Sequence, residues 1–152
     1  MRGHENTRSS VWKDHNDSST TVLAHNWHGR NLWETENETY AWVCYTILAY
    51  EIAGEPPALA ERKIKRKLRA KELGPYDQER VSELRRLRDA LKSEIRLYRK
   101  SNYYRGPTGA TASLEDYDFD GLVENFSRAF PNVSRTDMRG IVDFSLYLFY
   151  LR

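Results

Sequence analysis

The strongest constraint in this sequence is an apolar stripe that predicts one long amphipathic helix between Asp77 and about residue 101. Its apolar side chains recur at steps of three and four residues for about five turns, which places them on one helix face. Asp77 is the expected N-cap, with Tyr76 and Val81 at the positions of a hydrophobic staple. Such a helix must bury its stripe against other helices or a second subunit. The stripe consists of Val81, Leu84, Leu87, Leu91, Ile95 and Tyr98.

Residues 31–54 predict a second helix, central and buried. Thr35 and Glu38 have the spacing of a capping box, so the helix is expected to begin at Asn31 or Thr35. The run over residues 40–53 is apolar almost all round, which is typical of a helix buried on every side. The helix is expected to end at Gly54, because two prolines follow it.

Residues 58–73 predict a third helix, which ends at Gly74 and Pro75. The short connection to the striped helix favours an antiparallel helical hairpin over residues 58–101. Residues 102–113 contain two glycines and one proline and predict a loop. Helices are then expected over 114–152, the first beginning only at Asp118 or Asp120, and the last opening at Ser134.

The whole pattern predicts an all-α, single-domain helical bundle over residues 21–152, preceded by a flexible, partly irregular N-terminal arm over residues 1–20. A chain of 152 residues can bury roughly two-thirds of its unfolded surface without disulfides. Cys44 is the only cysteine, which favours a reducing compartment. Without a long apolar segment, we expect a soluble, cytoplasmic protein with no membrane contact. The pattern leaves the oligomeric state open.

Positive charge is concentrated in the predicted hairpin. The chain as a whole carries a net charge of only +2. Between Glu61 and Arg105, however, sixteen Lys and Arg stand against seven Asp and Glu, a net +9, and the rest carries −7. Such asymmetry favours a negatively charged partner, either nucleic acid or an acidic protein surface. A solvated face, or one lying against the chain's own acidic flanks, is the alternative.

The expected contacts form two basic rows followed by an aromatic pair that could stack on unpaired bases. They belong to a non-enzymatic accessory binding protein, with no cofactor and no catalytic residue expected. The first row is Arg62, Lys63, Lys65, Arg66, Lys67, Arg69 and Lys71, the second is Arg85, Arg88, Lys92 and Arg96, and Tyr103, Tyr104 and Arg105 follow them.

A metal-dependent enzyme is an alternative with weaker support. His25 and His28 could direct two imidazoles at one metal, with His15, Asp14 or Asp17 completing the site. Two acidic clusters, over residues 34–38 and 115–120, could hold Mg²⁺ if the fold brought them together. Acidic residues are also favoured at helix N-termini, and this interpretation is preferred, so no metal site is predicted. Cys44 lies in an apolar run and is expected to be an inert buried thiol.

The C-terminal region also has a helix-turn-helix interpretation, in which Arg135, Thr136 and Arg139 would face base edges. The second helix of this motif continues into a nearly all-apolar end, which suits a core element better.

Two patches, residues 26–43 and 114–126, resemble elements of small uncharacterised phage and plasmid proteins. Those proteins carry a Trp followed by Asn-Tyr-Glu-Thr-Trp at a helix start, and here Glu38, Thr39 and Tyr40 would occupy the Glu-Thr-Trp positions. The resemblance implies an accessory protein of a mobile element, without a known active site. It adds a further alternative, an inhibitor or adaptor that binds a host protein complex through acidic flanks and exposed Tyr and Trp.

Overall fold

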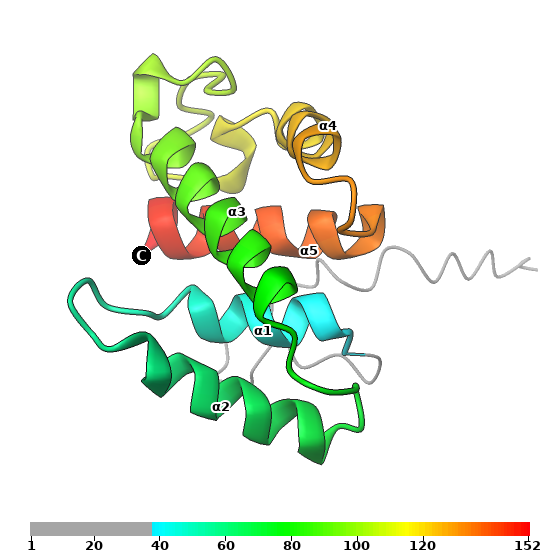
Figure 1. Cartoon of the computed structure of the whole chain (residues 1–152). Coiled ribbons are helices and arrows are strands. Elements are labelled where there is room, and N and C mark those ends of the chain that lie inside the picture. The colour runs from blue at the N-terminus through cyan, green and yellow to red at the C-terminus, as the bar shows by residue number, and fades with distance from the viewer. Residues whose placement is uncertain (1–37) are drawn as a thin grey trace, which may run out of the picture. The chain divides into compact units, whose positions relative to one another are not determined.

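The computed structural model describes residues 38–152, and these lie within one compact unit. They form helices and no strand, so the all-α prediction is confirmed for this part of the chain. Three helices, α1, α3 and α5, each pack against the other two, while α2 covers α1 and α4 packs on α5 (Figure 1). The helices are α1 (Tyr40–Leu48), α2 (Pro57–Ala70), α3 (Gln78–Arg96), α4 (Phe119–Ala129) and α5 (Arg135–Leu146).

Helix α1 is the buried central helix that the apolar run predicted. It begins at Tyr40 rather than at Thr35, because Thr39 is extended and its side chain accepts the hydrogen bond of the Trp42 N–H as the N-cap. The helix ends at Leu48, earlier than the expected Gly54, and the chain then turns so that Glu51 reaches α3. The predicted N-terminal arm lies outside the described residues.

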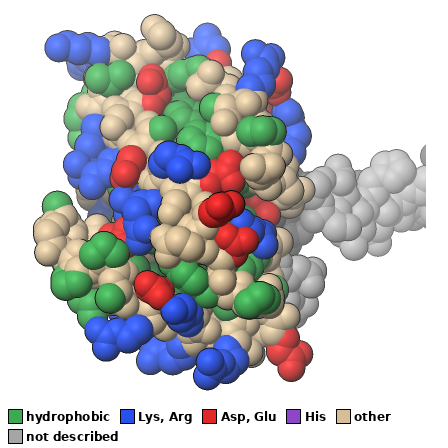
Figure 2. Space-filling model, viewed as in Figure 1, with side chains coloured by type: hydrophobic (Ala, Val, Ile, Leu, Met, Phe, Trp, Pro, Cys, Tyr) green, Lys and Arg blue, Asp and Glu red, His purple; other side chains and the backbone are tan. Residues whose placement is uncertain are grey.

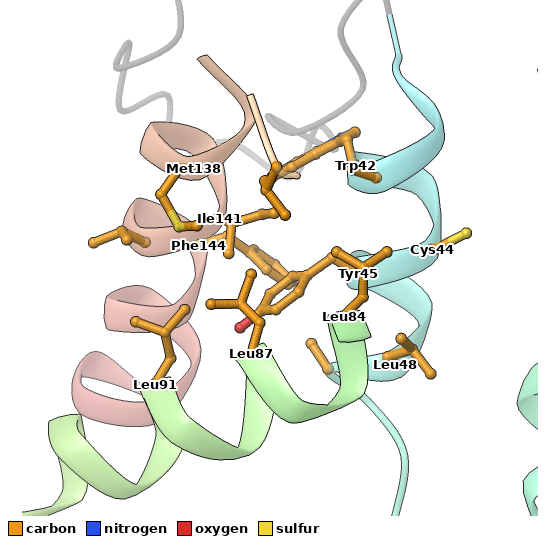
Figure 3. Packing of buried hydrophobic residues seen from close by; sticks show 14 of the residues in the cluster. Trp42, Cys44, Tyr45, Leu48, Leu84, Leu87, Leu91, Met138, Ile141 and Phe144 are labelled. Atoms are coloured by element: carbon orange, nitrogen blue, oxygen red, sulfur yellow. The ribbon is translucent and has the colours of Figure 1, made fainter. Parts of the chain in front are cut away.

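Helix α3 buries its stripe at the crossing with α1 and α5, as Figure 3 shows. Val81, Leu84, Leu87, Leu91 and Ile95 are all buried, which confirms the predicted face. Asp77 is confirmed as the N-cap, since one of its carboxylate oxygens accepts from the N–H groups of two residues in the first turn.

Tyr98, the last residue of the predicted stripe, is an exception. Its side chain is 49% exposed, because α3 ends at Arg96 and Tyr98 takes a positive φ of 50°. A residue beyond the last turn no longer follows the helical period, so its side chain leaves the core face.

Helices α2 and α3 follow one another through the turn at residues 71–77, but both pack chiefly against α1. Helix α2 offers only a narrow seam of Ala60, Ile64 and Leu68 for this contact. The described residues therefore do not confirm the hairpin as an antiparallel helix pair. The turn is a Schellman motif, in which the Leu73 N–H donates to the Leu68 carbonyl and the Glu72 N–H donates to the Arg69 carbonyl.

The predicted loop at residues 102–113 is anchored by one buried carboxylate, Asp116. That carboxylate accepts hydrogen bonds from the Thr108 N–H at 2.9 Å, the Ser113 N–H at 3.0 Å and the Tyr150 hydroxyl at 2.6 Å. Tyr150 lies in the closing π-helix η4 (Tyr147–Leu151), and Asp116 ends the short 3-10 helix η3 (Leu114–Asp116). Asp116 thus ties the loop to the C-terminal helix.

Helices α4 and α5 begin where the sequence predicted. Asp118 caps α4 through a hydrogen bond from the Gly121 N–H, and a Cβ at Gly121 would lie 2.3 Å from the Asp118 carboxylate. A side chain at position 121 would therefore displace the Asp118 carboxylate from its present position. Ser134 caps α5 by accepting from the Asp137 N–H at 3.1 Å. Among the residues described, no helix is both long and apolar enough to span a membrane.

We expect the hydrogen bonds to Asp116 to make the free energy of unfolding depend on pH in the acidic range. Hydrogen bonds from Tyr150, Ser113 and Thr108 hold the pKa of Asp116 well below its ordinary value. A lowered pKa gives stability that is complete above the unfolded pKa of about 4 and is lost as pH falls toward the folded value. The free energy of unfolding should therefore fall below about pH 4 in the native chain, and Asp116→Asn should flatten that dependence.

Urea unfolding at a series of acidic pH values measures this effect. Glu115→Gln is the matched control, because that neighbouring carboxylate is exposed and accepts no hydrogen bond from the described residues. The same acid dependence in Asp116→Asn and the native chain would contradict the anchor.

Candidate polyanion-binding surface

One face of α2 presents unpaired cations to solvent. Arg62, Lys63, Arg66 and Arg69 are exposed, lie opposite or beside the buried seam, and form no ion pair with any described residue. We call these four residues the α2 basic face. Figure 2 shows Lys and Arg side chains gathered along the edge of the molecule that α2 forms. Four of the seven cations of the first predicted row are therefore exposed to solvent on this face.

The other three cations of that row are engaged within the protein. Lys65 forms an ion pair with Glu61 and lies 4.9 Å from the centre of the Tyr76 ring. The Lys71 ammonium lies 2.7 Å from a carboxylate oxygen of Glu38, whose side chain is buried. Lys67 is half-buried beside the seam. Lys71 therefore ties the end of α2 to Glu38, whereas the Lys65–Glu61 pair lies within α2.

Two arginines of the second predicted row clamp a single carboxylate. Both oxygens of Glu51 accept from the Arg85 guanidinium, at 2.7 and 3.0 Å, and Arg88 donates to Glu51 and, at 2.8 Å, to the Leu48 carbonyl. Burial raises the pKa of Glu51, but the hydrogen bonds from both arginines outweigh that effect and leave the pKa below its ordinary value. Arg85 and Arg88 therefore fix the end of α1 to α3 rather than face a partner.

The rest of the second row contributes little. The Lys92 ammonium lies 5.8 Å from the centre of the Phe149 ring, and Arg96 is the one exposed member of this row. The second row is thus not a continuous basic surface.

The predicted aromatic pair packs inward. Tyr104 contacts Tyr117 edge to face with ring centres 5.5 Å apart, and the two residues form an isolated antiparallel bridge. The Tyr103 carbonyl accepts from the Asp118 N–H, and Arg105 pairs with the Asp118 carboxylate at 2.7 Å. These contacts order the loop, so the stacking role expected of Tyr103 and Tyr104 is not supported.

An open cleft of about 490 Å³ adjoins the α2 basic face at the C-terminal end of the helix. The turn at residues 71–77 folds back beside α2 and forms the second wall of the cleft. Periodicity could not reveal this cleft, because its far wall comes from residues beyond the helix. Its lining includes Lys65, Leu68, Arg69, Glu72, Pro75 and Tyr76.

The metal alternative gains no support from the described residues, in which no group of three His, Cys, Asp or Glu side chains could hold an ion. Asp116 and Asp118 serve the loop and the α4 cap, while Asp120 pairs with Arg139 at 3.1 Å. All four histidines lie outside the described residues. Cys44 is buried, as expected, and burial raises the pKa of its thiol to about 12, which disfavours the reactive thiolate.

The helix-turn-helix interpretation is not compatible with the packing of α5. Arg135 and Arg139 form ion pairs with acidic residues of α4, at 2.9 and 3.1 Å. Residues 140–146 of α5 are all buried. A helix that forms the centre of the core cannot enter a DNA groove.

Comparison with known proteins identifies no relative: no family model, no curated protein and no solved structure matches the chain. The resemblance to phage and plasmid proteins stays a prediction.

Proposed function

We propose that this protein is a non-enzymatic binding protein that docks a polyanion, in the first place the phosphate backbone of a nucleic acid, on the α2 basic face. The observation that carries the proposal is the exposure of four cations on one helix without a carboxylate partner among the described residues. Several cations elsewhere in the described chain, such as Arg85, Arg105 and Arg135, pair with acidic residues. Others that are exposed without an ion pair to a described residue, such as Arg86, Arg96, Arg99 and Lys100, lie outside α2.

The energetics of α2 support this function. Like charges three and four residues apart, such as Arg62 with Arg66 and Arg66 with Arg69, destabilise a helix by about 0.2–0.5 kcal/mol per pair. Only three side chains of α2 are buried to offset that repulsion. Phosphates along the exposed face would neutralise the charges and release condensed counterions, so binding would also stabilise the helix.

Removing the arginines should change the salt dependence of binding. In the triple variant Arg62→Gln, Arg66→Gln and Arg69→Gln, we expect weaker binding and a slope of log K against log salt that is smaller by about 2 to 3. Fluorescence polarisation with labelled single- and double-stranded DNA and RNA at several salt concentrations measures both quantities.

The matched control removes the same charge elsewhere. Arg86→Gln, Arg99→Gln and Lys100→Gln neutralise three exposed cations outside α2, so the net charge changes equally. This control should retain most of the slope. Equal losses in the two variants would mean that only net charge matters and would contradict a defined face. The absence of polynucleotide binding at low salt would exclude the nucleic-acid proposal.

An acidic protein surface is the second candidate partner. Exposed apolar side chains in α2 and in the connection before it, namely Leu59, Tyr50 and Ile52, favour a protein contact because such groups are enriched where proteins meet. A complex that is captured from lysate after nuclease treatment, and is lost in the Arg62, Arg66 and Arg69 triple variant, would favour this candidate. The host-complex inhibitor suggested by the resemblance is one form of it.

A further inference from the structure

We propose that the cleft at the end of α2 receives one unpaired nucleobase, so that the protein prefers single-stranded nucleic acid. This inference rests on the proposed function, since the α2 basic face must first hold the backbone. Arg69 belongs to that face and also lines the cleft, so a strand bound along α2 passes directly over the opening. The cleft is open to solvent and has a volume of about 490 Å³.

The lining has the composition that a base and its phosphate require. The Tyr76 ring is half-buried at one wall, and Pro75 adds exposed apolar surface on which a flat base can pack. Arg69, the member of the α2 basic face that lines the same opening, brings positive charge suited to the phosphate of that nucleotide. A bare anion would gain no contact from the apolar wall. A nucleotide can pack its base on that wall and place its phosphate near the positive charge.

Glu72 adds a carboxylate to the residues that line the cleft. It stands at φ +55°, a left-handed position where glycine is usual after a helix, and its side chain lines the cleft. A non-glycine residue in such a conformation marks a place to look for function. The Glu72 carboxylate would repel an acidic side chain, but it can accept hydrogen bonds from N–H groups on the Watson–Crick edge of a base.

The geometry of a carboxylate favours guanine in the cleft. Guanine presents two adjacent N–H donors, which two carboxylate oxygens can accept in parallel, whereas thymine presents one N–H between two carbonyl oxygens. We therefore expect a thymine strand that carries a single guanine to bind more tightly than an all-thymine strand. Base pairing in a duplex uses these donors, so a duplex cannot enter.

The decisive variant is Tyr76→Leu, which keeps an apolar side chain against the core but removes the aromatic ring. Its affinity for a short single-stranded DNA should fall about fivefold to a hundredfold, with no change in salt slope and none in duplex affinity. Tyr98→Leu is the matched control, because Tyr98 is also a partly exposed tyrosine beside cations but lies outside the cleft. It should leave binding unchanged.

Glu72→Gly distinguishes an effect on binding from an effect on folding. Glycine suits the left-handed position, so this variant should have a higher thermal unfolding midpoint while it loses the preference for the guanine-containing strand. A variant that folds better and discriminates less cannot be explained by structural damage.

The outcomes distinguish this inference from the proposed function. If Tyr76→Leu binds the single strand as tightly as the native chain while the α2 triple variant does not, the cleft proposal is overturned and the basic face is retained. Equal losses for duplex and single strand in Tyr76→Leu would also overturn base insertion. An unchanged guanine preference in Glu72→Gly would remove the role of that carboxylate. If the native chain binds no polynucleotide, both proposals fail.

Discussion

Leu87→Ala should lower the free energy of unfolding by about 2–5 kcal/mol, the largest effect we expect from a single substitution. Leu87 is fully buried where α3 crosses α1 and α5, between side chains of all three helices (Figure 3). Truncation would leave a cavity that neighbouring rings such as Tyr45 and Phe144 cannot fill without moving. Urea unfolding followed by circular dichroism measures the change.

Leu97→Ala provides the control on the same segment. Leu97 follows α3 and is 46% exposed, so its replacement should change stability by less than about 0.5 kcal/mol. Similar costs at the two leucines would show that the crossing of α3 over α1 and α5 is not the centre of the core.

Glu51→Ala is expected to lower the free energy of unfolding by about 2–4 kcal/mol, because two partly buried guanidinium groups lose their shared carboxylate. The Arg88 side chain is only 14% exposed, so water cannot fully replace the lost partner. Glu55→Ala is the matched control, since Glu55 is an exposed glutamate of the same connection and should change stability little.

The ion pairs of Glu51 with Arg85 and Arg88 should also make the free energy of unfolding depend on pH. The pKa of Glu51 lies below its ordinary value. The stabilisation by its ion pairs is therefore complete above the unfolded pKa of about 4.3 and declines as pH falls below that value. Glu51→Gln should therefore lose stability at neutral pH and lose much less in acid. If Glu51→Ala were as stable as the native chain, Arg85 and Arg88 would return to the set of available cations.

Local signals in the sequence predicted most of the helices correctly. The α3 stripe, the Asp77 and Ser134 caps and the start of α4 at Asp118 all depend on contacts within one or two turns. Such contacts are set by spacing alone. Predictions failed where a boundary depended on distant residues, as at the end of α1, where Glu51 leaves the helical path to pair with α3.

The candidate site likewise combines features that the sequence predicted with features that only the structure shows. The sequence by itself determined that positive charge is concentrated between Arg62 and Lys71, and that a thin seam of Ala60, Ile64 and Leu68 must face the body. The structure confirms that seam, and the orientation of the α2 basic face follows from it.

Only the tertiary structure decided which cations remain available. Arg85 lies 34 positions from Glu51, and no pattern along the chain could show that they meet. The cleft is equally nonlocal in origin, since it requires the Schellman turn to bring Tyr76 beside α2. Helical periodicity is a property of neighbouring residues, whereas ion pairing and concave surfaces depend on how separate segments pack in space.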